Sequence, residues 1–158
     1  IEIISTMPIL EREIVIGKYL AGLALIILGL VTTLIHYVTL ISVGSSIDHG
    51  AVFAGYLGLA LLGGVYTAVS LFASSVTDNQ VIAFIVGIAI VLVFFMLDKL
   101  LFFVPPSLSG IIQYLGTDFH LSNMSRGVID TRNLVYFGSV IGFFLALTVR
   151  ILESRKWN

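Results

Sequence analysis

Long stretches without charge constrain the fold of this chain more than any other feature. Residues 19–43 contain no ionised side chain, and residues 51–76, 81–104 and 134–152 are similarly apolar. A helix of about 20 apolar residues crosses the roughly 30 Å hydrocarbon core of a membrane. A membrane β-barrel would instead need alternating segments of about 10 residues, and the sequence has none. The sequence therefore predicts an all-α polytopic membrane helical bundle with four transmembrane helices.

Composition supports a lipid environment. Apolar residues make up 58% of the chain and charged residues 11%, whereas soluble domains carry roughly 25% charged residues. These polar residues are too few to coat a water-facing surface. The formal charge of −1 gives no reason to expect nucleic-acid binding. The absence of cysteine excludes disulfides, thiolate metal sites and cysteine nucleophiles.

Residues 1–18 precede the first span and are amphipathic. Glu11 and Glu13 follow Pro8, where acidic side chains favour the positive end of a new helix. We expect this helix to continue unbroken into the first span, so that a partner moving the segment would tilt the span. An interfacial anchor helix explains the same pattern, and the residues alone do not separate the two interpretations.

Residues 105–132 are too short and interrupted to cross a membrane. They begin with Pro105-Pro106, and the pattern predicts one short helix ending at Gly116 and a second ending near Gly127. We expect an outer hairpin of re-entrant or interfacial helices. Backbone at that depth must be covered by protein or line water, since lipid offers no hydrogen bonds.

Basic residues indicate the orientation of the chain. If the N-terminus is cytoplasmic, that side holds five basic residues and the opposite side three, which agrees with the excess of positive charge on cytoplasmic loops. We therefore expect a multi-pass protein of the inner (plasma) membrane with both ends of the chain cytoplasmic. Because Ile1 starts within an element, we also expect a fragment of a longer protein.

Residues that could carry chemistry are sparse. The chain has no phosphate-binding G-x-x-x-x-G-K-[ST] motif and no hydrolase motif, so we expect no catalytic residue and no metal. His36 lies in the first span, either as a functional polar site or, as we favour, as a neutral imidazole bonded to a neighbouring helix. Asp98 and Lys99 could gate a pathway, but snorkelling or ion pairing is favoured. His120 and Met124 could bind a soft metal, although a surface loop is the favoured interpretation.

Small residues four apart predict close helix packing. Gly138 and Gly142 form a G-x-x-x-G pattern in the last span, and Ala60, Gly64 and Ala68 repeat this spacing in the second. Such spacing lets helix backbones approach closely. It indicates packing within the chain or across a dimer, and it carries no information about a substrate.

Several segments resemble a known family. Residues 1–18 contain the elements E…T-x-P…E-I-V-x-G-K, which resemble the cytoplasmic coupling segment of ABC-2-type transporter permeases. Residues 71–80 resemble the next cytoplasmic turn of that family, while residues 127–137 and 147–157 resemble its gliding-motility-associated branch. One departure is Leu10, because relatives often carry a small helix-capping residue there.

The resemblance implies a permease subunit of a dimeric six-span transporter, from which two N-terminal spans would be missing here. An ABC ATPase would dock on the cytoplasmic side and carry the ATP and Mg, so this chain would bind no cofactor. The alternative is a structural membrane anchor of a motility or envelope complex, and an intramembrane enzyme using His36 is a third hypothesis. The implied coupling residues are Glu2, Pro8, Glu11, Arg12, Glu13, Gly17 and Lys18, with Thr77, Asp78, Asn79 and Gln80 in the cytoplasmic turn.

Overall fold

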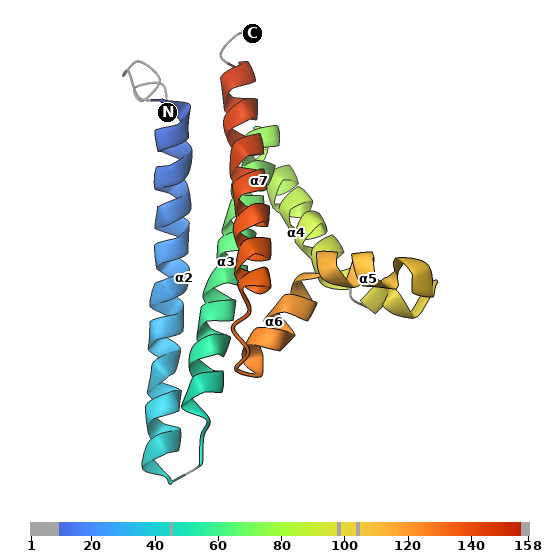
Figure 1. The fold of residues 1–158 in the computed structure, drawn as a ribbon. Helices are drawn as coiled ribbons and strands as arrows, with labels where there is room; N and C mark the ends of the chain where they lie inside the picture. Colours follow the sequence, from blue (N-terminus) through green and yellow to red (C-terminus); the bar gives the residue numbers. More distant parts are fainter. Residues whose placement is uncertain (1–9, 45, 98, 104, 156–158) are drawn as a thin grey trace.

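The computed structural model describes residues 10–44, 46–97, 99–103 and 105–155, and these residues form helices and short connections without any strand. The helices run along a single bundle from which the short outer helices project to one side (Figure 1). In chain order they are α2 (Glu11–Ser42), α3 (His49–Val76), α4 (Gln80–Leu97), the 3₁₀ helix η1 (Lys99–Phe103), α5 (Pro106–Leu115), α6 (Thr117–Ser125) and α7 (Thr131–Arg155).

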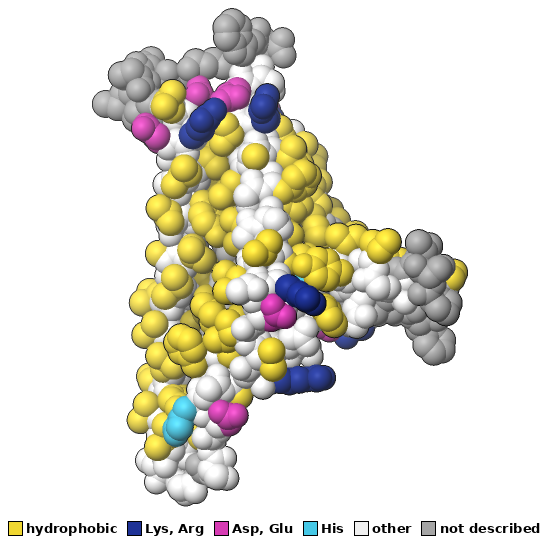
Figure 2. Space-filling model, viewed as in Figure 1, with side chains coloured by type: hydrophobic (Ala, Val, Ile, Leu, Met, Phe, Trp, Pro, Cys, Tyr) yellow, Lys and Arg dark blue, Asp and Glu magenta, His cyan; other side chains and the backbone are white. Residues whose placement is uncertain are grey.

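Four of these helices, α2, α3, α4 and α7, are long and apolar enough to cross a membrane. The all-helical bundle with four spans predicted from the sequence is therefore confirmed. Both described termini lie at the same end of the bundle, and the turn between α3 and α4 reaches that end as well (Figure 1). Side chains along the bundle are mostly hydrophobic, and charged groups gather at its terminal end and around the outer helices (Figure 2).

Helix α3 lies at the centre of the bundle and contacts α2, α4, α6 and α7. Its Val65, Ala68 and Val69 are buried against Phe137 and Phe144 of α7. Aliphatic side chains of α3 and aromatic side chains of α7 thus form one buried core. By contrast, most of the apolar side chains on α2 and α4 are exposed, as expected for helices that face lipid or other protein.

Two glycines bring α2 and α3 into close contact. A Cβ added at Gly22 of α2 would lie 2.6 Å from Cγ2 of Thr67, and one added at Gly63 of α3 would lie 2.7 Å from Cγ2 of Ile26. Real Cβ atoms essentially never approach this closely. The two helices can therefore keep their present separation only because both positions lack a side chain.

The third helix is shorter than the sequence predicted. Helix α4 ends at Leu97 and η1 follows it, so α4 covers only residues 81–97 of the expected span 81–104. The Nζ atom of Lys99 forms an ion pair with Oδ2 of Asp118 on α6 at 2.8 Å. This contact agrees with the ion pairing favoured for that lysine in the sequence analysis.

The outer segment contains the two expected short helices. Helix α5 begins at Pro106, a position where proline is well tolerated, and ends at Leu115 immediately before Gly116. Helix α6 ends at Ser125, and Gly127 follows with a φ of +85°. This left-handed backbone is accessible to glycine at little cost, and it turns the chain back toward α7.

Candidate functional site

The terminal end of the bundle brings together the predicted coupling segment, the predicted cytoplasmic turn and the end of the last helix. The start of α2, the turn between α3 and α4, and the end of α7 all lie there (Figure 1). Arg155 of α7 donates from Nη1 to Oδ1 of Asp78 in the turn, at 2.5 Å. This ion pair connects the α3–α4 turn with the end of α7. Because Asp78 is 90% exposed, the pair contributes little to stability.

The turn itself is ordered by local side-chain hydrogen bonds. Oδ1 of Asn79 accepts from the backbone N–H groups of Val81 and Ile82, at 2.9 and 3.3 Å, and so caps the start of α4. Oγ1 of Thr77 accepts from the Asn79 N–H at 3.2 Å. Gln80 is the first residue of α4 and is exposed. The predicted turn residues therefore form a defined connection between two membrane helices.

The predicted coupling residues lie partly within α2. Glu2 and Pro8 fall outside the described residues. Glu11 and Glu13 occupy the first turn of α2, where negative charge complements the helix dipole. Leu10 holds the N-cap position with extended backbone and provides no side-chain cap, as its departure from the family pattern implies.

The remaining predicted coupling residues continue along the same helix. Arg12, Gly17 and Lys18 are exposed, so a partner could reach them. Val15 is buried, with 2% of its surface exposed. The first turns of α2 therefore pack against the bundle on one side and present charged groups on the other.

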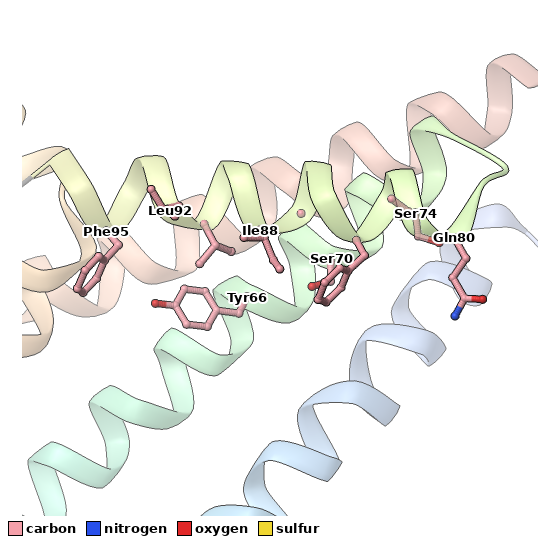
Figure 3. Close-up of a pocket in the computed structure, with 11 residues that line it drawn as sticks. Tyr66, Ser70, Ser74, Gln80, Ile88, Leu92 and Phe95 are labelled. Atoms are coloured by element: carbon pink, nitrogen blue, oxygen red, sulfur yellow. The ribbon is translucent and has the colours of Figure 1, made fainter.

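A second candidate site is an open groove of about 500 Å³ between α3 and α4. Tyr66, Ser70 and Ser74 recur every four residues and place three hydroxyl groups along one face of α3. Figure 3 shows the Tyr66 ring between the two helices, with its hydroxyl directed toward Phe95 of α4. Because no ionisable carboxylate, amine or imidazole lines the groove, it suits an apolar ligand or helix with hydrogen-bonding groups better than an ion. The other lining residues are Gln80, Ala83, Phe84, Gly87, Ile88, Val91 and Leu92.

A buried polar cluster holds the outer helices against α7. His120 is fully buried, with Nδ1 2.7 Å from Oδ1 of Asn133 and Nε2 2.8 Å from the backbone oxygen of Tyr114. The His120 ring stacks on Tyr136 with centroids 3.9 Å apart, and the Tyr136 hydroxyl donates to the Leu115 oxygen at 2.6 Å. These contacts tie α6, the end of α5 and the start of α7 together.

The surface-loop interpretation of His120 and Met124 is wrong. Both side chains lie on α6 and are fully buried, and Met124 packs against Gly58 of α3. Both ring nitrogens of His120 already face oxygen atoms, so the ring has no nitrogen left for a metal. In the part of the chain that is described, no three His, Cys, Asp or Glu residues come together as a metal site.

Two other predicted residues face outward. His36 is exposed on α2. No described residue forms a hydrogen bond with its ring, so the expected bond to a neighbouring helix is not made within the described part of the chain and stays a prediction. Positions Gly138 and Gly142 of α7 have no atom within 4 Å of an added Cβ. These two glycines therefore make no close contact with the described residues, and packing across a dimer stays a prediction. Gly64 and Ala68 of α3 are buried in the core.

Comparison with known protein families agrees with a helical membrane protein. A family model described as ABC-2 family transporter protein matches residues 1–150. Searches of curated proteins and of solved structures gave no significant match. The family match covers nearly the whole chain, including α2, α3, α4, the outer helices and most of α7. The chain therefore belongs to the ABC-2 family of transporter proteins, as a membrane permease component of an ABC transporter.

Proposed function

We propose that this permease couples ATP hydrolysis by a separate ABC ATPase to export across the membrane. The observation that carries the proposal is the continuity of α2, which runs unbroken for 32 residues from the charged terminal end into the bundle. At a rise of about 1.5 Å per residue, this helix is about 48 Å long. A displacement of its first turn by a partner would therefore be carried deep into the membrane.

The charged terminal end is the proposed docking surface. An ATPase would contact Glu11, Arg12, Glu13 and Lys18 on α2 and the exposed turn around Asp78. The resemblance adds Glu2, Pro8 and Gly17 to this surface. ATP and Mg would be held by the ATPase, and this end of the bundle would be cytoplasmic in the inner membrane.

A second permease subunit would complete the transport pathway. The groove between α3 and α4 offers a mostly apolar wall with three hydroxyl groups, which suits one side of such a pathway. Gly138 and Gly142 are open on the surface of α7, and their spacing permits close contact with a helix of another chain.

A role in gliding motility is the more specific part of the proposal. It rests on the resemblance of residues 127–137 and 147–157 to the gliding-motility-associated branch. Deletion of the gene should then abolish surface gliding in an organism that glides. Normal gliding of the deletion strain would remove this part and leave the transporter proposal intact.

The decisive experiment reverses charge at the terminal end. Glu13→Lys should lower co-purification of the cognate ATPase and its stimulation by the permease at least about fivefold, because Glu13 is exposed and its charge is available to a partner. Arg132→Glu is the matched control at the opposite end of α7 and should leave both quantities unchanged. Unchanged ATPase binding and stimulation in Glu13→Lys would contradict the proposal.

Transport itself needs a separate measurement. Vesicles containing the permease and its ATPase should move cargo in an ATP-dependent way. If the ATPase assembles normally and nothing crosses in either direction, the chain is instead a structural membrane anchor.

A further inference from the structure

A cleft of about 600 Å³ lies between α2 and α7 at the terminal end of the bundle. It is distinct from the α3–α4 groove, and the two share no lining residue. Charged side chains gather at this end of the molecule (Figure 2). The cleft is lined by Arg12, Val15, Ile16, Leu145, Ala146, Val149, Arg150 and Glu153.

The charge of the cleft is positive. Arg12 and Arg150 are both exposed, and the described residues give neither guanidinium group an ion-pair partner. Glu153 is the one acidic residue in the lining, so one positive charge is left over. Two guanidinium groups that enter one cleft from different helices are suited to bidentate hydrogen bonding of a phosphate group.

The rest of the cleft is apolar. Val15 and Ile16 of α2 face Leu145, Ala146 and Val149 of α7 across it. A free inorganic anion would gain nothing from these side chains. A ligand that combines an anionic group with hydrocarbon would use both parts of the cleft.

The surface of α7 extends this apolar lining toward the membrane centre. Gly138, Gly142 and Ala146 are spaced four residues apart and so lie on one face of the helix. Space beside both glycines is open. The apolar surface beside the cleft therefore continues along α7 toward the membrane centre.

The two arginines also lie at the level expected for lipid headgroups. Arg12 is in the first turn of α2, before the charge-free stretch 19–43, and Arg150 follows the charge-free stretch 133–149 of α7. Both guanidinium groups therefore flank the hydrocarbon region at the same end of the bundle. Basic pockets between membrane helices at this level bind the headgroups of anionic lipids.

We infer that the α2–α7 cleft binds the phosphate headgroup of an anionic phospholipid, with Arg12 and Arg150 as its ligands. The exposed side chains of Ile16 and Ala146 contact the glycerol region of that lipid. The inference requires that the four helices span a membrane. It does not depend on coupling to an ATPase.

The test is native mass spectrometry of the purified chain in micelles that contain equal amounts of phosphatidylglycerol and phosphatidylcholine with matched acyl chains. The wild type should retain phosphatidylglycerol preferentially. Each of Arg12→Gln and Arg150→Gln should lower this retention about fivefold. Glu153→Gln removes the opposing charge and should raise it. Arg126→Gln and Arg132→Gln are the matched controls and should have no effect, because these exposed arginines lie outside the cleft.

Three results would overturn the inference. Equal retention of the two lipids by the wild type would show that the cleft has no preference for an anionic headgroup. Complete displacement of phosphatidylglycerol by millimolar inorganic phosphate would show a simple anion site. Unchanged retention in the Arg12→Gln/Arg150→Gln double variant would place the lipid elsewhere. If that variant fails to fold, Arg12→Lys/Arg150→Lys keeps both charges but loses the bidentate geometry, so it should keep only part of the preference. Complete loss of preference in this folded variant would contradict headgroup binding by charge.

Discussion

Gly63→Ala is the sharpest test of the contact between α2 and α3. The added Cβ would lie 2.7 Å from Cγ2 and 3.1 Å from Cδ1 of Ile26. Ile26 is β-branched, and one χ1 rotamer dominates for such residues in a helix, so the side chain cannot turn away cheaply. The two helices must then separate or the isoleucine must leave its rotamer. Overpacking of this kind costs about 1–3 kcal/mol.

The matched control is Gly29→Ala in α2, where no atom lies within 4 Å of the added Cβ. Replacing an unconstrained helical glycine by alanine stabilises a helix by roughly 0.5–1 kcal/mol. Gly63→Ala should gain the same helix propensity but lose more through the clash. We therefore expect it to be less stable than Gly29→Ala by about 1–3 kcal/mol.

Reversible unfolding in mixed micelles measures both free energies. The double variant Gly63→Ala/Ile26→Ala removes the clashing methyl groups, so the glycine substitution should cost much less in that background. Equal stabilities of Gly63→Ala and Gly29→Ala would refute the close approach of the two helices. The same conclusion would follow if Gly63→Ala lowered the free energy of unfolding equally in the wild type and in the Ile26→Ala background.

Three further predictions concern other contacts. His120→Ala should destabilise the chain by about 3 kcal/mol in the same unfolding assay. The substitution leaves a buried cavity and leaves the two oxygen atoms that face the His120 ring without a hydrogen-bond partner. The exposed control His36→Ala should stay within about 0.5 kcal/mol of the wild type, and similar losses in the two variants would contradict the burial of His120. Asn79→Ala should cost about 1 kcal/mol because it removes the cap of α4, whereas Asn79→Asp should retain most of that stability; equal losses would argue against capping. Lys99→Ala removes an exposed ion pair and should cost less than about 1 kcal/mol, and a larger loss that salt does not reduce would show that the pair is not solvent-screened.

The spans could be predicted from the sequence because hydropathy is a local property. A charge-free stretch such as 19–43 needs a membrane whatever it packs against, and the short polar breaks fix antiparallel neighbours. The end of α4 was harder to place. Residues 98–104 continue the apolar composition, but Lys99 pairs with Asp118 on another helix, and spacing within one segment does not reveal such a partner.

The buried state of His120 could not be predicted for a similar reason. It depends on α6 lying between α3 and α7, and its partners come from α5 and α7. The available signal was the spacing of Asn133 and Tyr136 on one face at the start of α7, where an amide and an aromatic hydroxyl enter an apolar helix. Polar side chains of this kind in a membrane helix favour a hydrogen-bonding partner on another helix.

The arrangement of contacts also restricts how a movement of α2 could reach the outer hairpin. Among the described elements, α2 touches α3 and α7, whereas α6 touches α3, α4, α5 and α7. On α3 the first contact is made at Gly63 against Ile26, and the second at Gly58 against Met124 of α6. Both contacts use glycines of one helix, and both leave little room, since an added Cβ at Gly58 would lie 3.2 Å from Cβ of Met124. Close-packed contacts resist compression, so a shift of α2 toward α3 must displace α3 itself, and α6 must move with it or lose its packing. Substitutions at Gly58 should therefore disturb the outer hairpin without altering the terminal end of α2. Such variants distinguish a movement that reaches α6 through α3 from one that reaches α6 through α7.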